Sequence, residues 1–366
     1  MKAKYPQVKQ DLYGAFVYRG IELADATGLL AIVIGDTWMS IKSFEAMRLR
    51  LLDGHSFGSF VHLRDVSNHP DIFGANAAFV LSMAGKRSHH APFIRLTPLG
   101  SERKEQDLRV ALAERTSDSG FHLASGDDFA SIPGTPIVYW LSEKMRGSFS
   151  TGRPLSEVAN LRQGLATADN NRFLRQWWEV SGRRAAFACT SREEAQASGA
   201  RWFPYNKGGE FRKWYGNQEH VVNWENDGAE IVAFKPRSVI RNPSTYFSPS
   251  VSWSKVSSGS PAFRMYPPGF IFDVAGTSIF ATTSQDGLGL LAFANSQVAL
   301  EQLAAVAPTL NYEVGQVANL PVANAVAEEL VGLASSAVTE AKADWDCFET
   351  SWDFTQNPLV ELSAMG

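Results

Sequence analysis

The chain has 366 residues, of which 45% are hydrophobic and 20% charged, and its formal net charge is -4. This composition is typical of a globular protein long enough for two domains. No apolar core follows the basic N-terminal residues, and the longest apolar run, residues 28–35, is too short to cross a bilayer. We therefore expect a cytoplasmic protein with no membrane partner. Cys189 and Cys347 match no metal-binding spacing and predict free thiols.

Apolar residues at helical spacing predict a helix within residues 8–26, and the run L-L-A-I-V-I predicts a buried strand over residues 29–34. A second helix is predicted over residues 40–52, and two further strands over residues 59–63 and 77–83. This alternation indicates an α/β fold with a mostly parallel sheet. Only about three strands can be placed before Lys86, whereas a doubly wound domain needs about five or more.

The pattern changes along the rest of the chain. Residues 86–98 read as a polar loop, residues 101–117 as a charged helix and residues 121–150 as a connector. After residue 154, short β-type runs are separated by Gly, Pro, Asn and Ser, which predicts a mixed, turn-rich domain. Helical patterns return at residues 287–305 and 323–348.

Basic and aromatic residues concentrate between residues 141 and 260. This segment is net positive although the rest of the chain is net negative, and it holds six of the ten tryptophans. A basic, aromatic-rich block within an acidic chain is typical of a domain that binds a polyanion. A basic face without a ligand would explain the charge equally well, and Trp and Phe more often pack a core than face DNA.

No complete catalytic motif is present in the sequence. Methyl transfer to an exocyclic amine uses Asn/Asp-Pro-Pro-aromatic, in which a side-chain oxygen and a Pro carbonyl accept hydrogens from the amine of an extruded base. Here Pro267-Pro268 is preceded by Tyr266, and Pro204-Tyr205 is preceded by a phenylalanine that supplies no acceptor. The seven histidines form no zinc motif, and no serine-hydrolase motif occurs, so neither class of enzyme is supported.

Several longer stretches resemble a known family when they are taken together and in order. They are R-Q-G-L-A-T-A-D-N-N-R-F-L-R-Q-W-W-E-V, W-F-P-Y-N-K-G-G-E-F-R-K-W-Y-G-N, V-V-N-W-E-N-D-G, S-W-S-K-V-S-S-G, G-F-I-F-D-V-A-G-T-S-I-F and A-K-A-D-W-D-C-F-E-T-S-W-D-F. They resemble the C-terminal part of the PglX-type adenine-specific DNA methyltransferases of BREX phage-exclusion systems. Near the N-terminus, D-L-Y-G-A-F-V-Y-R-G-I-E-L and G-L-L-A-I-V-I-G-D-T-W-M resemble the segments that follow the catalytic motif in these enzymes.

The resemblance implies a domain organisation. Residues 1–100 would be the C-terminal part of a Rossmann-like methyltransferase domain, and residues 101–150 a helical connector. Residues 151–322 would be a mixed α+β domain that recognises the DNA target, and residues 323–366 a helical tail.

The resemblance also implies a function. The complete enzyme uses S-adenosyl-L-methionine to methylate N6 of adenine, with the cofactor loop and Asn-Pro-Pro-Tyr preceding the part that this chain matches. We therefore expect a truncated or split methyltransferase that recognises double-stranded DNA but neither binds the cofactor nor transfers methyl groups alone. Its expected protein partners are an upstream methyltransferase polypeptide or other phage-defence subunits. The alternative is a non-catalytic DNA-binding or assembly subunit of a phage-defence complex.

The family's functional residues suggest individual roles. Phe73 occupies the place of a phenylalanine that stacks on the flipped adenine, although a loop ring that caps the sheet is an equal alternative. In the family's G-L-A-T-x-D-N motif a glycine stands where this chain has Ala168, which leaves the geometry of that turn open. The cations expected to anchor phosphates are Arg172, Arg175, Lys207, Arg212, Lys213 and Lys255. The amides expected to read base edges are Asn170 and Asn206.

Overall fold

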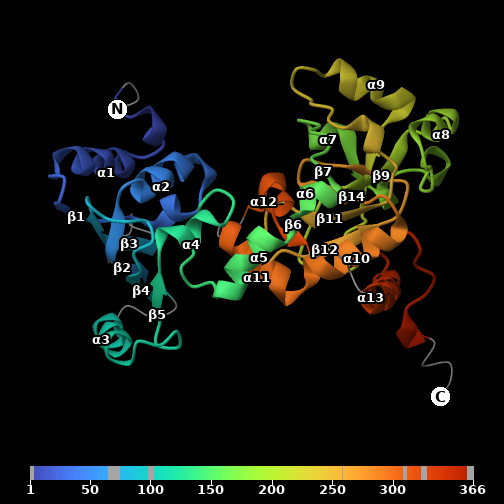
Figure 1. Ribbon diagram of the computed structural model, residues 1–366. Coiled ribbons are helices and arrows are strands. Elements are labelled where there is room, and N and C mark those ends of the chain that lie inside the picture. The colour runs from blue at the N-terminus through green and yellow to red at the C-terminus, as the bar shows by residue number, and fades with distance from the viewer. Residues whose placement is uncertain are drawn as a thin grey trace. The chain divides into compact units, whose positions relative to one another are not determined.

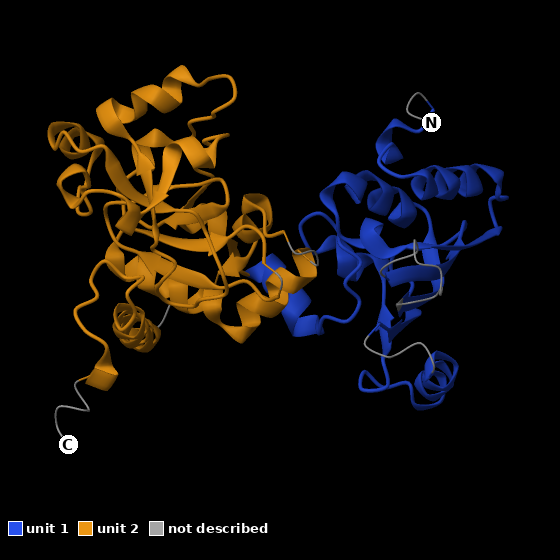
Figure 2. Ribbon diagram, turned by 180° about the vertical axis from the view of Figure 1, so that it is seen from behind, with its two compact units in different colours: residues 1–151 blue, residues 152–366 orange. Residues whose placement is uncertain are grey.

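The computed structural model describes residues 4–64, 75–97, 103–257, 259–307, 311–322 and 328–360. The chain forms two compact units, residues 1–151 and residues 152–366 (Figure 2). Helices and strands are interspersed along both units, and the strands of the second unit are mostly shorter (Figure 1). The chain is therefore a mixed α/β protein. No helix in the described part of the chain has the length and apolar character needed to span a membrane.

The first unit contains a five-stranded sheet with the strand order β1-β3-β2-β4-β5. Its elements are α1 (Leu12–Leu23), β1 (Leu29–Gly35), α2 (Glu45–Leu52), β2 (Ser56–Arg64), β3 (Ala75–Ser82), β4 (Ala91–Leu96), α3 (Lys104–Glu114), β5 (Phe121–Ala124), α4 (Gly126–Ala130) and α5 (Glu143–Thr151). Helix α1 and strand β1 lie where the apolar pattern predicts them. The prediction that this strand is buried is wrong, because β1 ends the sheet and its alternate residues Leu29, Ala31 and Val33 are exposed. The Asp11 carboxylate caps α1 by accepting a hydrogen bond from the backbone N–H of Tyr13 at 3.3 Å.

The prediction of a mostly parallel sheet is wrong. Strands β2 and β4 are parallel, but β3 is antiparallel to both β1 and β2, and β5 is antiparallel to β4. The prediction that residues 86–98 form a loop is also wrong, because they contain β4. Pro92 and Arg95 interrupt the apolar run of this short strand, and a polar segment precedes it, so its sequence resembles a loop. Residues 121–124, within the expected connector, form β5 and extend the sheet.

Aromatic rings fill the core on the face of this sheet that α1 and α2 cover. Phe60 stacks between Phe79 and Phe93, with ring centroids 5.9 and 5.0 Å apart, and Tyr139 stacks on Phe93 at 4.9 Å. All four side chains are almost completely buried. Helix α3 covers part of the opposite face, where its Ala111 packs with Ile94 and Leu96 of β4. The unit therefore has helices on both faces of its sheet, as expected of a layered α/β fold.

The second unit contains two four-stranded sheets, β13-β9-β10-β8 and β12-β11-β14-β7, and a short pair, β15-β6. Its strands are β6 (Arg153–Pro154), β7 (Asn160–Arg162), β8 (Leu174–Gln176), β9 (Trp202–Asn206), β10 (His220–Asn223), β11 (Ser250–Ser254), β12 (Phe263–Tyr266), β13 (Ile271–Phe272), β14 (Gly276–Phe280) and β15 (Pro321–Val322). Its helices are α6 (Leu155–Val158), α7 (Asn170–Phe173), α8 (Arg192–Ala197), α9 (Glu225–Ala233), α10 (Ser284–Asn295), α11 (Gln297–Val306), α12 (Val314–Ala318) and α13 (Glu328–Asp346).

Capping by serine divides the helix expected over residues 287–305. The Ser296 hydroxyl accepts a hydrogen bond from the backbone N–H of Ala299 at 3.2 Å, and this single residue separates α10 from α11. The predicted C-terminal helix is present as α13, which packs along α10. The core of this unit contains the buried rings of Phe173, Phe203, Tyr205 and Phe247.

Candidate nucleic-acid interface

Three segments that are far apart in the sequence meet at one end of the sheet β13-β9-β10-β8. In this sheet His220, the first residue of β10, pairs with Gln176 of β8 on one side and with Tyr205 of β9 on the other. Ile271 of β13 pairs with Tyr205 in turn, and the next pair places Phe272 beside Asn206. Strands β8, β9 and β13 therefore all end here. Their register brings together the ends of Q-W-W, W-F-P-Y-N-K and G-F-I-F-D-V.

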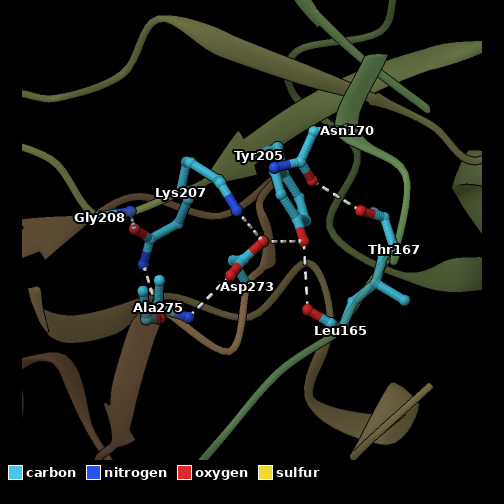
Figure 3. Close-up of polar contacts among 10 residues, drawn as sticks. Leu165, Thr167, Asn170, Tyr205, Lys207, Gly208, Asp273 and Ala275 are labelled. Carbon is cyan, nitrogen blue, oxygen red and sulfur yellow. Dashed lines mark hydrogen bonds and ion pairs between the residues drawn. The ribbon is translucent and has the colours of Figure 1, made fainter. Parts of the chain in front are cut away.

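The Asp273 carboxylate is the centre of a buried polar network at this end of the sheet (Figure 3). One of its oxygens accepts hydrogen bonds from the Tyr205 hydroxyl and from the Lys207 ammonium, both at 2.7 Å, and the other accepts one from the backbone N–H of Ala275 at 2.7 Å. Burial, and next the Asp273 charge, raise the pKa of Tyr205 well above its ordinary value. The phenol is therefore neutral at physiological pH and acts as a hydrogen-bond donor.

Asn206 is part of the fold and not of the surface. It is 1% exposed, and its amide nitrogen donates to the Ser252 hydroxyl at 2.6 Å and to the Gly276 carbonyl at 3.1 Å. Its amide oxygen accepts a hydrogen bond from the backbone N–H of Gly208 at 3.1 Å. The prediction that Asn206 reads a base edge is therefore wrong, because its polar atoms are enclosed and occupied. The side chain instead joins the end of β9 to β11 and β14 of the other sheet.

The loop before α7 is hydrogen-bonded to the backbone on both sides of Asp273. The backbone N–H of Leu165 donates to the Phe272 carbonyl at 2.8 Å, and the Val274 N–H donates to the Leu165 carbonyl at 3.0 Å. Ala168 then adopts a φ of 61°, in the left-handed region that favours glycine. The turn therefore has the conformation that a glycine would adopt most easily, and alanine occupies it with strain.

Asn170 is the predicted base reader that remains accessible. It is exposed at the start of α7, and its side-chain oxygen accepts a hydrogen bond from the buried Thr167 hydroxyl at 2.7 Å (Figure 3). This bond fixes the side-chain direction and leaves the amide N–H groups available to a ligand. Thr167, which the sequence did not single out, is thus a positioning residue for Asn170.

Two adjoining hollows lie on this surface and share Asn170 and Lys207. The larger, of about 410 Å³, is also lined by Arg175 and Gln176 of β8, by Glu179 of the 3-10 turn that follows β8, and by His220 of β10, together with Asn171 and Leu174. The smaller, of about 280 Å³, lies over Thr167 and Asp273. Burial is the main cause that lowers the pKa of His220, so its imidazole is neutral at pH 7 and can donate or accept a hydrogen bond. Gln176 and His220 were missed because only the register of the strands brings them here.

Arg175 is the predicted phosphate-binding cation that lines the larger hollow without a carboxylate partner. Its guanidinium donates to the carbonyls of Asn171 and Leu174 and lies 5.7 Å from the ring centroid of Trp202. No carboxylate lies within ion-pair distance of it in the described part of the chain. Lys207, by contrast, pairs with Asp273 and keeps 28% of its side chain exposed. The positive charge at the larger hollow therefore comes chiefly from Arg175.

Three of the other predicted cations have carboxylate partners, whereas Lys213, like Arg175, makes no ion pair among the described residues. Arg172 lies 3.9 Å from Glu230, Arg212 lies 3.4 Å from Asp344 of α13, and Lys255 lies 2.9 Å from Glu313. Lys213 donates to the Asn295 carbonyl at 3.2 Å. The structure does not gather these side chains around the two hollows, since none of them lines either one. Phe73 lies outside the described residues, so its proposed stacking role stays a prediction.

Comparison with known proteins shows that the chain matches a portion of two adenine-specific methyltransferases. It is 33% identical over 367 residues to the adenine-specific methyltransferase PglX of Lacticaseibacillus casei (strain Zhang), which covers 97% of this chain and 30% of that protein. It is also 33% identical over 365 residues to the adenine-specific methyltransferase BrxX of Escherichia coli O9:H4 (strain HS), covering 98% of this chain and 29% of that protein. No family model matches the chain.

A solved structure shares the fold. The type IIL restriction-modification enzyme MmeI, determined in complex with DNA, aligns with a TM-score of 0.57 at 11% identity, over 96% of this chain and 47% of the other. The resemblance expected from the sequence motifs is confirmed, although the chain spans about a third of the length of the methyltransferases that it matches. The chain is therefore related, over nearly its whole length, to a C-terminal portion of the PglX-type adenine-specific methyltransferases.

Proposed function

We propose that this chain is the DNA-recognising portion of a site-specific N6-adenine methyltransferase of a phage-defence system. In this proposal the first unit is the end of a Rossmann-like catalytic domain, and the second unit recognises the target in double-stranded DNA. The relation to PglX and BrxX supports the enzyme class. The likeness to MmeI supports the fold.

The observation that carries the DNA proposal is the surface around the two hollows. It presents an uncompensated guanidinium from Arg175, an oriented amide from Asn170, and the polar side chains of Gln176 and His220. A guanidinium is suited to a phosphate, while amides and a neutral imidazole are suited to base edges. Beneath them, the Asp273 network and Asn206 hold the surface to both sheets of the unit, so these groups are placed before any ligand binds.

The cofactor belongs to the complete enzyme in this proposal. S-adenosyl-L-methionine would be bound by the part of the methyltransferase that lies outside the matched region, since the sequence contains no Asn-Pro-Pro-Tyr and no complete cofactor loop. The chain alone would then bind DNA without binding the cofactor. Isothermal titration of the isolated chain with S-adenosyl-L-methionine tests this directly, and measurable binding would contradict it.

The DNA proposal is tested by fluorescence anisotropy with a short labelled duplex of arbitrary sequence, titrated at several salt concentrations. We expect binding that weakens with salt, and we expect Arg175→Ala to lower the slope of log K against log salt by ~1, because one phosphate contact is lost. Arg153→Ala is the matched control, because Arg153 is exposed, pairs with Glu157 at 3.7 Å and lines neither hollow. Equal losses for the two variants, or no binding by the wild type at low salt, would refute the assignment of this surface.

A further inference from the structure

A large aromatic groove lies in the second unit and shares no lining residue with the two hollows of the candidate nucleic-acid interface. Its volume is about 960 Å³, and six of the side chains that line it are aromatic. It is formed by three parts of the chain, which are residues 177–190 after β8, residues 265–270 and residues 338–353, together with Tyr215 and Gln218. The groove is therefore a separate feature of this unit, and the proposed DNA surface leaves it without a role.

Contacts between these parts of the chain fix the shape of the groove. The indole N–H of Trp177 donates to the Thr350 carbonyl at 2.9 Å, which joins the segment after β8 to the residues that follow α13. The Trp352 ring packs on Phe187 and on Phe270, with ring centroids 4.9 and 5.8 Å apart. One ring thus contacts both of the other parts of the lining. The groove is therefore formed before any ligand enters, as is usual for binding sites.

The charges in the groove balance one another. Among the described residues that line it, the charged side chains are Lys342 and Asp353, which form an ion pair at 2.8 Å. Lys342 also pairs with Asp346 and lies 5.4 Å from the ring centroid of Tyr215. Proteins that bind single-stranded nucleic acid combine aromatic rings with a positively charged groove, and such a charge is absent from this lining. A cationic ligand would in turn face the Lys342 ammonium. The lining therefore favours a neutral ligand.

Hydrogen-bond donors in the groove lack acceptors. Neither the indole N–H of Trp178, a residue that is 44% exposed, nor that of Trp352 donates to an acceptor in the described part of the chain. The amide nitrogen of Gln218 is buried and also has no acceptor there, whereas its amide oxygen accepts a hydrogen bond from the Tyr215 hydroxyl at 3.1 Å. A ligand that complements this lining is apolar and neutral, and it offers acceptors rather than donors.

A proline-rich chain in the polyproline II conformation has these properties. Its rings pack on aromatic faces, its prolines carry no N–H, and its carbonyls make no hydrogen bonds within the chain. We propose that the groove binds a proline-rich segment of a partner protein, with proline rings against Trp178 and Trp352 and carbonyls that accept hydrogen bonds from the two indole N–H groups. The segment comes from outside this chain, because the one pair of adjacent prolines in the sequence, Pro267-Pro268, lines the groove itself. This inference concerns a protein partner, so it goes beyond the proposed function and does not depend on it.

Fluorescence polarisation with a labelled decaproline peptide tests the proposal, and a labelled Gly-Ser peptide of equal length is the control. We expect the full chain to bind decaproline with a Kd below about 1 mM and the Gly-Ser peptide not at all in that range. In NMR spectra the indole N–H signals of Trp178 and Trp352 should shift on binding, whereas that of Trp253, which is buried and donates to the Tyr312 carbonyl, should not. No binding of decaproline, or equal binding of both peptides, would overturn the proposal. Displacement of decaproline by a short oligothymidine would also overturn it, because the groove would then bind nucleic acid.

Exposed aromatic side chains provide a matched set of variants. Trp178→Ala should weaken decaproline binding by about tenfold or more, because the ring and its N–H are both lost. Trp178→Phe keeps a ring without the N–H and should weaken binding by a smaller factor. Phe348→Ala is the control, because Phe348 is 52% exposed and does not line the groove. Thermal denaturation verifies that each variant is folded, and wild-type affinity in both Trp178 variants would refute the site. Binding of duplex DNA should be unchanged in Trp178→Ala, so the two proposals fail separately.

Discussion

Replacing Asp273 with alanine should destabilise the second unit severely. The carboxylate is 1% exposed and accepts hydrogen bonds from the Tyr205 hydroxyl, the Lys207 ammonium and the Ala275 backbone N–H. Lys207 can turn toward water after the substitution, and the Tyr205 hydroxyl keeps the Leu165 carbonyl at 3.3 Å. The N–H of Ala275 loses its partner. Hydrogen bonds to charged groups contribute ~1.5–3 kcal/mol each, and an orphaned buried group costs ~1–3 kcal/mol, so we expect a loss of about 3–5 kcal/mol.

Urea denaturation followed by tryptophan fluorescence measures this loss, because eight of the ten tryptophans belong to the second unit. With a slope of about 2–3 kcal/mol per molar urea, the midpoint should fall by about 1–2 M. Asp273→Asn should cost less, since the amide keeps the shape and one acceptor oxygen. Glu157→Ala is the control, because it removes a carboxylate from an exposed ion pair with Arg153 and should change stability by at most ~0.5 kcal/mol. A loss below about 1 kcal/mol for Asp273→Ala would refute the view that this network holds the surface in place.

Three further predictions concern the same unit. Ala168→Gly should raise the free energy of unfolding by about 0.5–1 kcal/mol, because glycine adopts the left-handed φ of 61° without strain. The control Ala343→Gly, in the exposed part of α13, should lower the free energy of unfolding by a similar amount. A lower free energy of unfolding for both variants would contradict the strained turn. Asn206→Ala should cost about 2–4 kcal/mol in urea denaturation, because the Gly208 N–H loses its buried acceptor and the Gly276 carbonyl keeps only the Ser278 hydroxyl as a side-chain donor. A stable variant with altered base preference would restore the rejected role. Burial lowers the pKa of His220 in the folded unit below its value in the unfolded chain, so the unfolded chain binds a proton more readily. The unit should therefore lose stability as pH falls below about 6.5. His220→Gln should weaken this pH dependence, and equal pH dependence of stability in the variant and the wild type would contradict the prediction.

The first helix and strand could be predicted because their apolar spacing is regular and local. The direction of the strands could not, since β2 and β4 are parallel neighbours although β3 lies between them in the sequence. Strand β4 was not predicted, because its six residues include Pro92 and Arg95 and show only a weak alternation of apolar and polar residues. Local sequence thus predicted the elements better than their pairing.

The family motifs could be found from the sequence, but the roles of their side chains depended on pairing and burial. Asn206 and Asn170 are the same residue type, yet one is enclosed between two sheets and the other is exposed. The partner of Arg212 lies 132 positions further along the chain, in α13. No local pattern indicates such a contact. Which of the predicted cations make ion pairs could therefore be determined only from the three-dimensional structure.

Under the proposed function, the link that Asn206 makes between the two sheets has a consequence for changing the DNA sequence that the second unit recognises. Substitutions of residues beneath the hollows disturb β9, β11 and β14 together, so few substitutions there are compatible with folding. Asn170, Arg175 and Gln176 lie on the rim, where their side chains can be exchanged while the frame below stays intact. We expect libraries confined to this rim to yield folded proteins with altered target preference, and libraries that include the floor to yield mostly unfolded ones.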